Sequence, residues 1–65
     1  MPFIHVRILK GRSADKKERL IKELTNVASE VLDAPMETVR VLISEIEPEH
    51  WGIAGESVKK RRENE

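Results

Sequence analysis

Residues 14–32, ADKKERLIKELTNVASEVL, decide the fold of this chain. Their apolar side chains recur at the three- and four-residue spacing that places them along one stripe of an α-helix. Ser13 is expected to cap the start of this helix. Ala34 precedes Pro35 and is therefore biased away from helical backbone angles, so the helix should end before it. The stripe consists of Leu20, Ile21, Leu24, Val27, Ala28, Val31 and Leu32.

A strand pattern lies on each side of this helix. Residues 2–9, PFIHVRIL, alternate with a period of two, and residues 39–46, VRVLISEI, are rich in β-branched and apolar side chains. Two strands joined by a long helix form a β-α-β unit, so the strands should be parallel with a right-handed crossover. One sheet face packs on the helix, while the other carries large apolar side chains that need a cover: Phe3, Leu9, Leu42 and Ile46.

The C-terminal part is expected to be a hairpin followed by a charged tail. Residues 50–55, HWGIAG, place glycines among small and apolar residues, a pattern typical of a tight turn or hairpin. Residues 57–65, SVKKRRENE, are highly charged and are predicted to be frayed. Residues 1–65 contain no repeat and no linker. We therefore expect a single α/β domain, made of one β-α-β unit with a two-stranded parallel sheet plus a C-terminal hairpin.

Length and composition indicate how such a small fold is supported. The chain has 65 residues, and a domain this short buries only about 60% of the surface that its unfolded chain exposes. It has no cysteine, which excludes disulfides and thiolate zinc sites, and His5 and His50 are too far apart in the sequence to suggest a metal cluster. A lone β-α-β unit also leaves both strands as edges. Self-association into a homo-oligomer is therefore expected.

Charge and hydropathy exclude other classes of protein. Twelve Lys and Arg balance twelve Asp and Glu, so no net charge draws the chain to nucleic acid or to an anionic membrane. No apolar run approaches the roughly 20 residues that span a bilayer, and residues 1–10 lack the shape of a signal peptide. A soluble cytoplasmic protein is expected. The basic run Lys59-Lys60-Arg61-Arg62 leaves a nucleic-acid-binding module as an alternative, although flanking glutamates favour a solvated tail.

A few residues in unusual places could carry chemistry. Removal of Met1 would expose Pro2 as a secondary amine, and an ordinary α-amino group titrates at about 7.7–8.0. Apolar burial or nearby arginines would lower that pKa and leave a neutral amine that can act as a general base. Arg12 and Arg40 are candidate carboxylate clamps, because a guanidinium binds a carboxylate through two parallel hydrogen bonds. Each signal is weak alone, and Trp51 could equally be a packing residue of an oligomer core.

Together these pieces resemble the 4-oxalocrotonate tautomerase family, the small members of the tautomerase superfamily. The resemblance covers nearly the full length at matching spacing. Two departures are Trp51, at a position that is typically Phe, and Ala54, which replaces a glycine usual in the hairpin. The matching pieces are Met1-Pro2, Ile8-Leu9, Gly11-Arg12-Ser13, Leu20-Ile21, Leu32-Asp33-Ala34-Pro35, Val39-Arg40-Val41, Gly52-Ile53 and Gly55-Glu56.

The resemblance implies a hexamer, built as a trimer of dimers, and a cofactor-free and metal-free enol–keto tautomerase. Such an isomerase acts on 2-hydroxydienoates or 2-oxo acids such as 2-hydroxymuconate. The resemblance makes Pro2 the general base and Arg40 the residue that holds the near carboxylate and polarises the 2-oxo group. Arg12 would bind the far carboxylate of a dicarboxylate substrate. Trp51 and Leu9 would line the apolar pocket around the amine.

An alternative reaction in the superfamily is the dehalogenation of 3-haloacrylates. Those enzymes resemble this chain but add a substrate-binding Arg and a water-activating Glu. The corresponding positions here are Leu9 and Ile53, which cannot activate water. The resemblance therefore favours tautomerisation.

Strand geometry bears on how a complete site would form. At roughly 3.3 Å per residue, the strand from Pro2 to Leu9 spans about 23 Å. Arg12 lies just beyond that strand, so its side chain is not expected to reach Pro2 of the same chain. Arg40, in contrast, should share the starting edge of the parallel sheet with Pro2.

Overall fold

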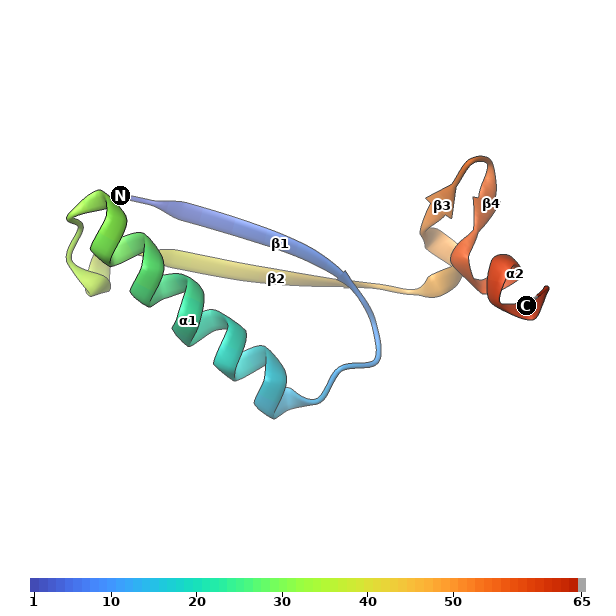
Figure 1. The fold of residues 1–65 in the computed structure, drawn as a ribbon, viewed down its shortest axis with the longest axis horizontal. Helices are drawn as coiled ribbons and strands as arrows, with labels where there is room; N and C mark the ends of the chain where they lie inside the picture. Colours follow the sequence, from blue (N-terminus) through green and yellow to red (C-terminus); the bar gives the residue numbers. More distant parts are fainter. Residues whose placement is uncertain (65) are drawn as a thin grey trace.

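A computed structural model describes residues 1–64 of the chain. It contains a β-α-β unit followed by a short C-terminal assembly of a hairpin and a helix (Figure 1). In chain order the elements are β1 (Phe3–Leu9), α1 (Ala14–Leu32), the 3₁₀ turn η1 (Met36–Thr38), β2 (Arg40–Ile46), the 3₁₀ turn η2 (Pro48–His50), β3 (Gly52–Ile53), β4 (Glu56–Ser57) and α2 (Val58–Glu63).

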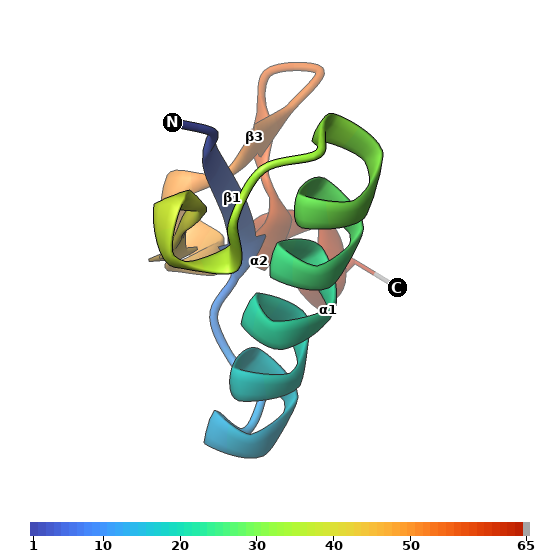
Figure 2. The same cartoon turned by 90° about the vertical axis from the view of Figure 1, so that its left-hand side faces the viewer.

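Strands β1 and β2 form the parallel sheet that the sequence predicted. Their register runs from Phe3 beside Arg40 to Leu9 beside Ile46. Helix α1 covers one face of this sheet, and Figure 2 shows it to one side of β1. Alternation along each strand sends every second side chain towards the helix. These partly buried side chains are Ile4, Val6, Ile8, Val41 and Ile43.

Helix α1 begins and ends where its local sequence predicts. The Ser13 hydroxyl accepts a hydrogen bond from the backbone N–H of Lys16 at 3.3 Å, which confirms the predicted cap. Asp33 adopts the left-handed conformation, with a φ of 53°. The N–H of Ala34 then donates to the carbonyl oxygen of Ser29 at 3.1 Å, which satisfies a helix-end carbonyl before the chain turns to Pro35.

A single copy of the chain leaves much apolar surface exposed. Within residues 1–64, Val39 and Val58 are the only buried apolar residues, and each is still 8% exposed. On the sheet face away from α1, Phe3 is 64% exposed and Leu42 is also exposed. On α1 itself, Val31 is 72% exposed. The expected self-association would bury this surface, which a chain of this size cannot cover by itself.

Residues 47–64, here called the C-terminal arm, extend beyond one end of the sheet (Figure 1). The arm elongates the molecule to principal extents of 46 × 24 × 14 Å. Its hairpin confirms the sequence prediction, since β3 and β4 pair antiparallel with Ile53 beside Glu56. The tip residues Ala54 and Gly55 have φ values of 52° and 87°, the left-handed backbone that a tight hairpin turn requires. Ala54 therefore holds a conformation that favours glycine.

The prediction of a frayed tail over residues 57–65 needs correction. Residues 58–63 form helix α2, because the Ser57 hydroxyl accepts a hydrogen bond from the N–H of Lys60 at 3.1 Å and caps it. Val58 is buried, and its N–H donates to the carbonyl oxygen of Trp51 at 2.8 Å. The charged composition of this segment obscured its Ser57 cap and its buried Val58. Residue 65 lies outside the described residues. Within residues 1–64, neither helix combines the length and apolarity needed to cross a bilayer.

Candidate active site

The starting edge of the sheet brings Pro2 and Arg40 together, as parallel pairing predicted. The backbone N–H of Arg40 donates to the carbonyl oxygen of Pro2 at 2.9 Å. The Arg40 side chain turns back onto the segment before β2. Its Nη1 donates to the carbonyl oxygens of Glu37 at 2.5 Å and Val39 at 3.4 Å. Because both strands begin at this edge, it holds Pro2 beside a guanidinium-bearing residue.

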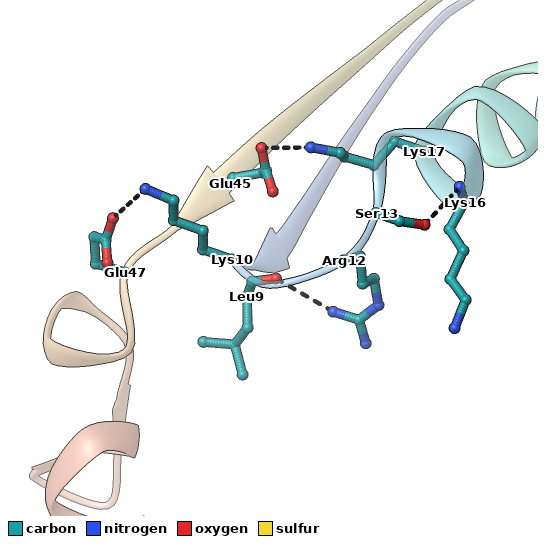
Figure 3. Close-up of polar contacts among 8 residues, drawn as sticks. All are labelled: Leu9, Lys10, Arg12, Ser13, Lys16, Lys17, Glu45 and Glu47. Carbon is teal, nitrogen blue, oxygen red and sulfur yellow. Dashed lines mark hydrogen bonds and ion pairs between the residues drawn. The ribbon is translucent and has the colours of Figure 1, made fainter.

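Arg12 and Leu9 lie at the opposite end of the sheet. Arg12 Nη1 donates to the carbonyl oxygen of Leu9 at 3.2 Å, and the two side chains point to the same side of the loop (Figure 3). Trp51 follows η2 in the C-terminal arm and is half-buried. One chain therefore divides the predicted site residues between two ends, with Pro2 and Arg40 at one and Leu9 and Arg12 at the other.

Neither arginine is neutralised by a carboxylate within residues 1–64. The ion pairs there join Lys10 to Glu47, Lys17 to Glu45 and Arg19 to Glu23. The guanidinium groups of Arg12 and Arg40 instead donate to backbone carbonyl oxygens. A ligand carboxylate forms stronger, charge-assisted hydrogen bonds with such a group than a carbonyl does. Both arginines can therefore bind an anionic group.

An ion pair that no local sequence pattern predicts lies where the arm begins. Lys10 Nζ is 3.0 Å from Glu47 Oε1 (Figure 3). The backbone N–H of Lys10 donates to the carbonyl oxygen of Ile46 at 2.9 Å. The hydrogen bond between the two side chains raises the pKa of Lys10 and lowers the pKa of Glu47. The strand register predicts this ion pair. Because Leu9 lies beside Ile46, the next residues of the two segments, Lys10 and Glu47, also lie side by side.

Two other features do not define the site. A shallow hollow lies along α1 and contains none of the predicted site residues. Its lining consists of Lys16, Arg19, Leu20 and Glu23. Among residues 1–64, no three or more His, Asp or Glu side chains cluster closely enough to hold a metal ion.

Residues 2–61 match the family model described as "Tautomerase enzyme". Over 59 residues the chain is 49% identical to a 2-hydroxymuconate tautomerase of Stutzerimonas stutzeri, covering 91% of this chain and 94% of that protein. The chain belongs to the 4-oxalocrotonate tautomerase family. A 2-hydroxymuconate tautomerase of Pseudomonas putida is 47% identical to this tautomerase over 62 residues, covering 95% and 98% of the two chains. The predicted family is thus confirmed, and the protein is a tautomerase, an isomerase that acts on small molecules.

Solved structures agree with the fold of this tautomerase. TomN, described as a 4-oxalocrotonate tautomerase homologue in the tomaymycin biosynthetic pathway, superposes with a TM-score of 0.93 at 44% identity, and the match covers 95% of each chain. A heterohexameric 4-oxalocrotonate tautomerase from Chloroflexus aurantiacus J-10-fl gives a TM-score of 0.88 at 33% identity, covering 92% of this chain and 97% of that one. The β-α-β unit and its hairpin arm are therefore the fold of the family.

Proposed function

We propose that this tautomerase converts 2-hydroxydienoates, such as 2-hydroxymuconate, into their conjugated 2-oxo isomers without a cofactor. The observation that carries the proposal is the placement of two arginines whose guanidinium groups hydrogen-bond to backbone carbonyl oxygens. One is Arg40, whose backbone pairs with Pro2, and the other is Arg12 at the far end of the sheet. Two separate cationic groups suit a substrate with two carboxylates. The similarity to 2-hydroxymuconate tautomerases supports the same substrate class.

Pro2 is the proposed general base, acting through its amine once Met1 has been removed. The neutral amine takes the 2-hydroxyl proton of the dienol and returns a proton at a distant carbon, which leaves the 2-oxo isomer. An amine is essential to this step. While Met1 is attached, the Pro2 nitrogen is an amide whose lone pair is delocalised into the carbonyl group and is not basic.

The remaining site residues bind and polarise the substrate. Arg40 holds the near carboxylate and stabilises the negative charge that develops on the 2-oxygen. Arg12 binds the far carboxylate and so fixes the substrate's orientation. Trp51 and Leu9 supply an apolar wall that disfavours the charged form of the amine.

We also propose that the working enzyme is a hexamer, a trimer of dimers. The exposed Phe3 and Leu42 on the uncovered sheet face favour burial against another copy. Arg12 and Pro2 stand at opposite ends of β1, so a complete site needs Arg12 from a neighbouring chain. Light scattering should give a hexamer at micromolar concentration, whereas a stable folded monomer with full activity would contradict this assembly.

The base is tested by comparing two preparations of the wild-type chain in an ultraviolet assay of 2-hydroxymuconate. One has Pro2 verified as the N-terminus by mass spectrometry, and the other carries an N-terminal extension that keeps the Pro2 nitrogen in an amide bond. We expect turnover from the first and little from the second. Equal rates would exclude Pro2 as the base, and no turnover from the first would refute the proposed substrate class.

A further inference from the structure

The cations at the far end of β1 fall into two kinds. Lys10 and Lys17 are each held by a carboxylate, Lys10 by Glu47 at 3.0 Å and Lys17 by Glu45 at 2.9 Å. Both carboxylates belong to the end of β2 or the residue that follows it, and Figure 3 shows these lysines reaching across to them. Their charges are therefore partly compensated within the chain.

Arg12 and Lys16 differ from these lysines. Within residues 1–64 neither side chain is in an ion pair. In Figure 3 both point to the side of the loop that also carries Leu9, away from Glu45 and Glu47. Two uncompensated positive charges and an apolar side chain thus face the same side of this end of the molecule.

Local hydrogen bonds fix the backbone from which both cations project. Arg12 Nη1 donates to the carbonyl oxygen of Leu9 at 3.2 Å. The N–H of Lys16 donates to the Ser13 hydroxyl at 3.3 Å, which locks the first turn of α1 to the loop. The cap therefore fixes the backbone at Lys16, and the contact with Leu9 holds the Arg12 side chain.

The hollow that Lys16 lines includes neither Arg12 nor Leu9 and is otherwise balanced in charge. Lys16 lines the hollow on α1 together with Leu20 and a pair of charged residues. In that pair, Arg19 Nε lies 3.7 Å from Glu23 Oε1. Two cationic residues, Lys16 and Arg19, thus line this hollow. Within residues 1–64, Arg19 has a carboxylate partner and Lys16 has none.

We propose that Lys16 is a substrate-binding residue that shares the far carboxylate of a dicarboxylate substrate with Arg12 of the same chain. This inference rests on the proposed function and adds a specificity determinant to it. A carboxylate has two oxygens and accepts several hydrogen bonds, so a planar guanidinium fork and a compact ammonium can bind it together. Lys16 raises affinity for substrates with a second carboxylate and contributes nothing to those that lack one.

The test compares Lys16→Gln with Lys22→Gln in the assembled enzyme. Lys22 is an exposed lysine on the same helix, displaced by about 240° around the axis, so it controls for the general loss of one positive charge. The substrates are 2-hydroxymuconate, which has two carboxylates, and 2-hydroxypenta-2,4-dienoate, which has one. Circular dichroism checks that both variants are folded.

For Lys16→Gln we expect the KM for 2-hydroxymuconate to rise about two- to fivefold, the range that an exposed ion pair supplies. The kcat, and both constants for the monocarboxylate, should stay at the wild-type values. The rise should grow at low ionic strength, where charges are screened less. Lys16→Arg should restore most of the affinity, and Lys22→Gln should match the wild type.

Two outcomes would overturn the inference. The first is Lys16→Gln behaving like Lys22→Gln on both substrates, and the second is an equal KM rise for both substrates, which would mean that Lys16 does not sense the far carboxylate. Failure of the proposed function can be told apart from failure of the Lys16 proposal, because the wild-type enzyme would then turn over neither substrate.

Discussion

Subunits carrying Pro2→Ala should rescue subunits carrying Arg12→Ala when the two are assembled together. Strand β1 separates the two positions in one chain, and roughly 3.3 Å per residue makes the path from Pro2 to Leu9 about 23 Å long. Arg12 also donates to the carbonyl oxygen of Leu9 at 3.2 Å, which keeps its guanidinium at the far end. A functional pair of base and far-carboxylate clamp must therefore come from different chains.

The expected recovery follows from random assembly. Each working site needs one chain with an intact Pro2 and another chain with an intact Arg12. In an equal mixture about half of the chains meet each requirement, so about a quarter of the sites contain both intact residues. The mixture should regain about a quarter of the wild-type activity at the same total subunit concentration.

The assay dissociates both variants in denaturant and refolds them together. It follows 2-hydroxymuconate by ultraviolet absorbance at a substrate concentration well below the wild-type KM, where a variant with a raised KM is also impaired. Native mass spectrometry establishes that mixed oligomers have formed. Variants refolded separately and then combined are the control, and they should stay at the low activity of the parents. A parallel mixture of Pro2→Ala with Arg40→Ala asks the same question of Arg40: rescue assigns Arg40 to a neighbouring chain, and no rescue assigns it to the same chain.

A single result would exclude a site shared between subunits. If mixed oligomers are present and each parent is severely impaired, yet the mixture stays inactive, Pro2 and Arg12 do not meet across a subunit boundary.

Three further outcomes are expected. Arg40→Ala should lower kcat about 10²- to 10³-fold, as loss of an oxyanion donor does. Arg12→Ala should chiefly raise KM, by about 10- to 100-fold for a lost charged hydrogen bond. Equal losses of kcat in the two variants would contradict these separate roles. Ala54→Gly should raise the free energy of unfolding by about 0.5–1 kcal/mol, because relief of the left-handed strain at φ 52° exceeds the entropy lost with glycine; denaturant unfolding measures it, and a loss of stability would disprove the strain. Glu47→Gln should slightly lower the free energy of unfolding at neutral pH. Its difference from wild type should disappear as the pH falls through the lowered pKa of Glu47, and also as the pH rises through the raised pKa of Lys10. A pH-independent difference in the free energy of unfolding would argue against the ion pair.

Much of the fold could be predicted because its signals are local. The two periods of apolar residues, the Ser13 cap and Pro35 depend on neighbours along the chain, and they specified the order strand, helix, strand. The parallel pairing then followed from topology, and with it the closeness of Pro2 and Arg40. The motif pieces also sufficed to recognise the family, which the comparisons confirmed. The roles assigned to Pro2, Arg12 and Arg40 remain predictions.

What only the tertiary structure decided depends on contacts between distant segments. Helix α2 was missed because its charges dominate its composition, while its stability comes from the Ser57 cap and from Val58 buried in the arm. The pairing of Lys10 with Glu47 joins residues 37 positions apart, which no local pattern reports. Periodicity tells which face a side chain takes, but not whether its charge meets a partner. Lys16 and Lys17 are adjacent in the sequence, yet the packing of α1 against β2 gives Lys17 a carboxylate and leaves Lys16 facing away from it.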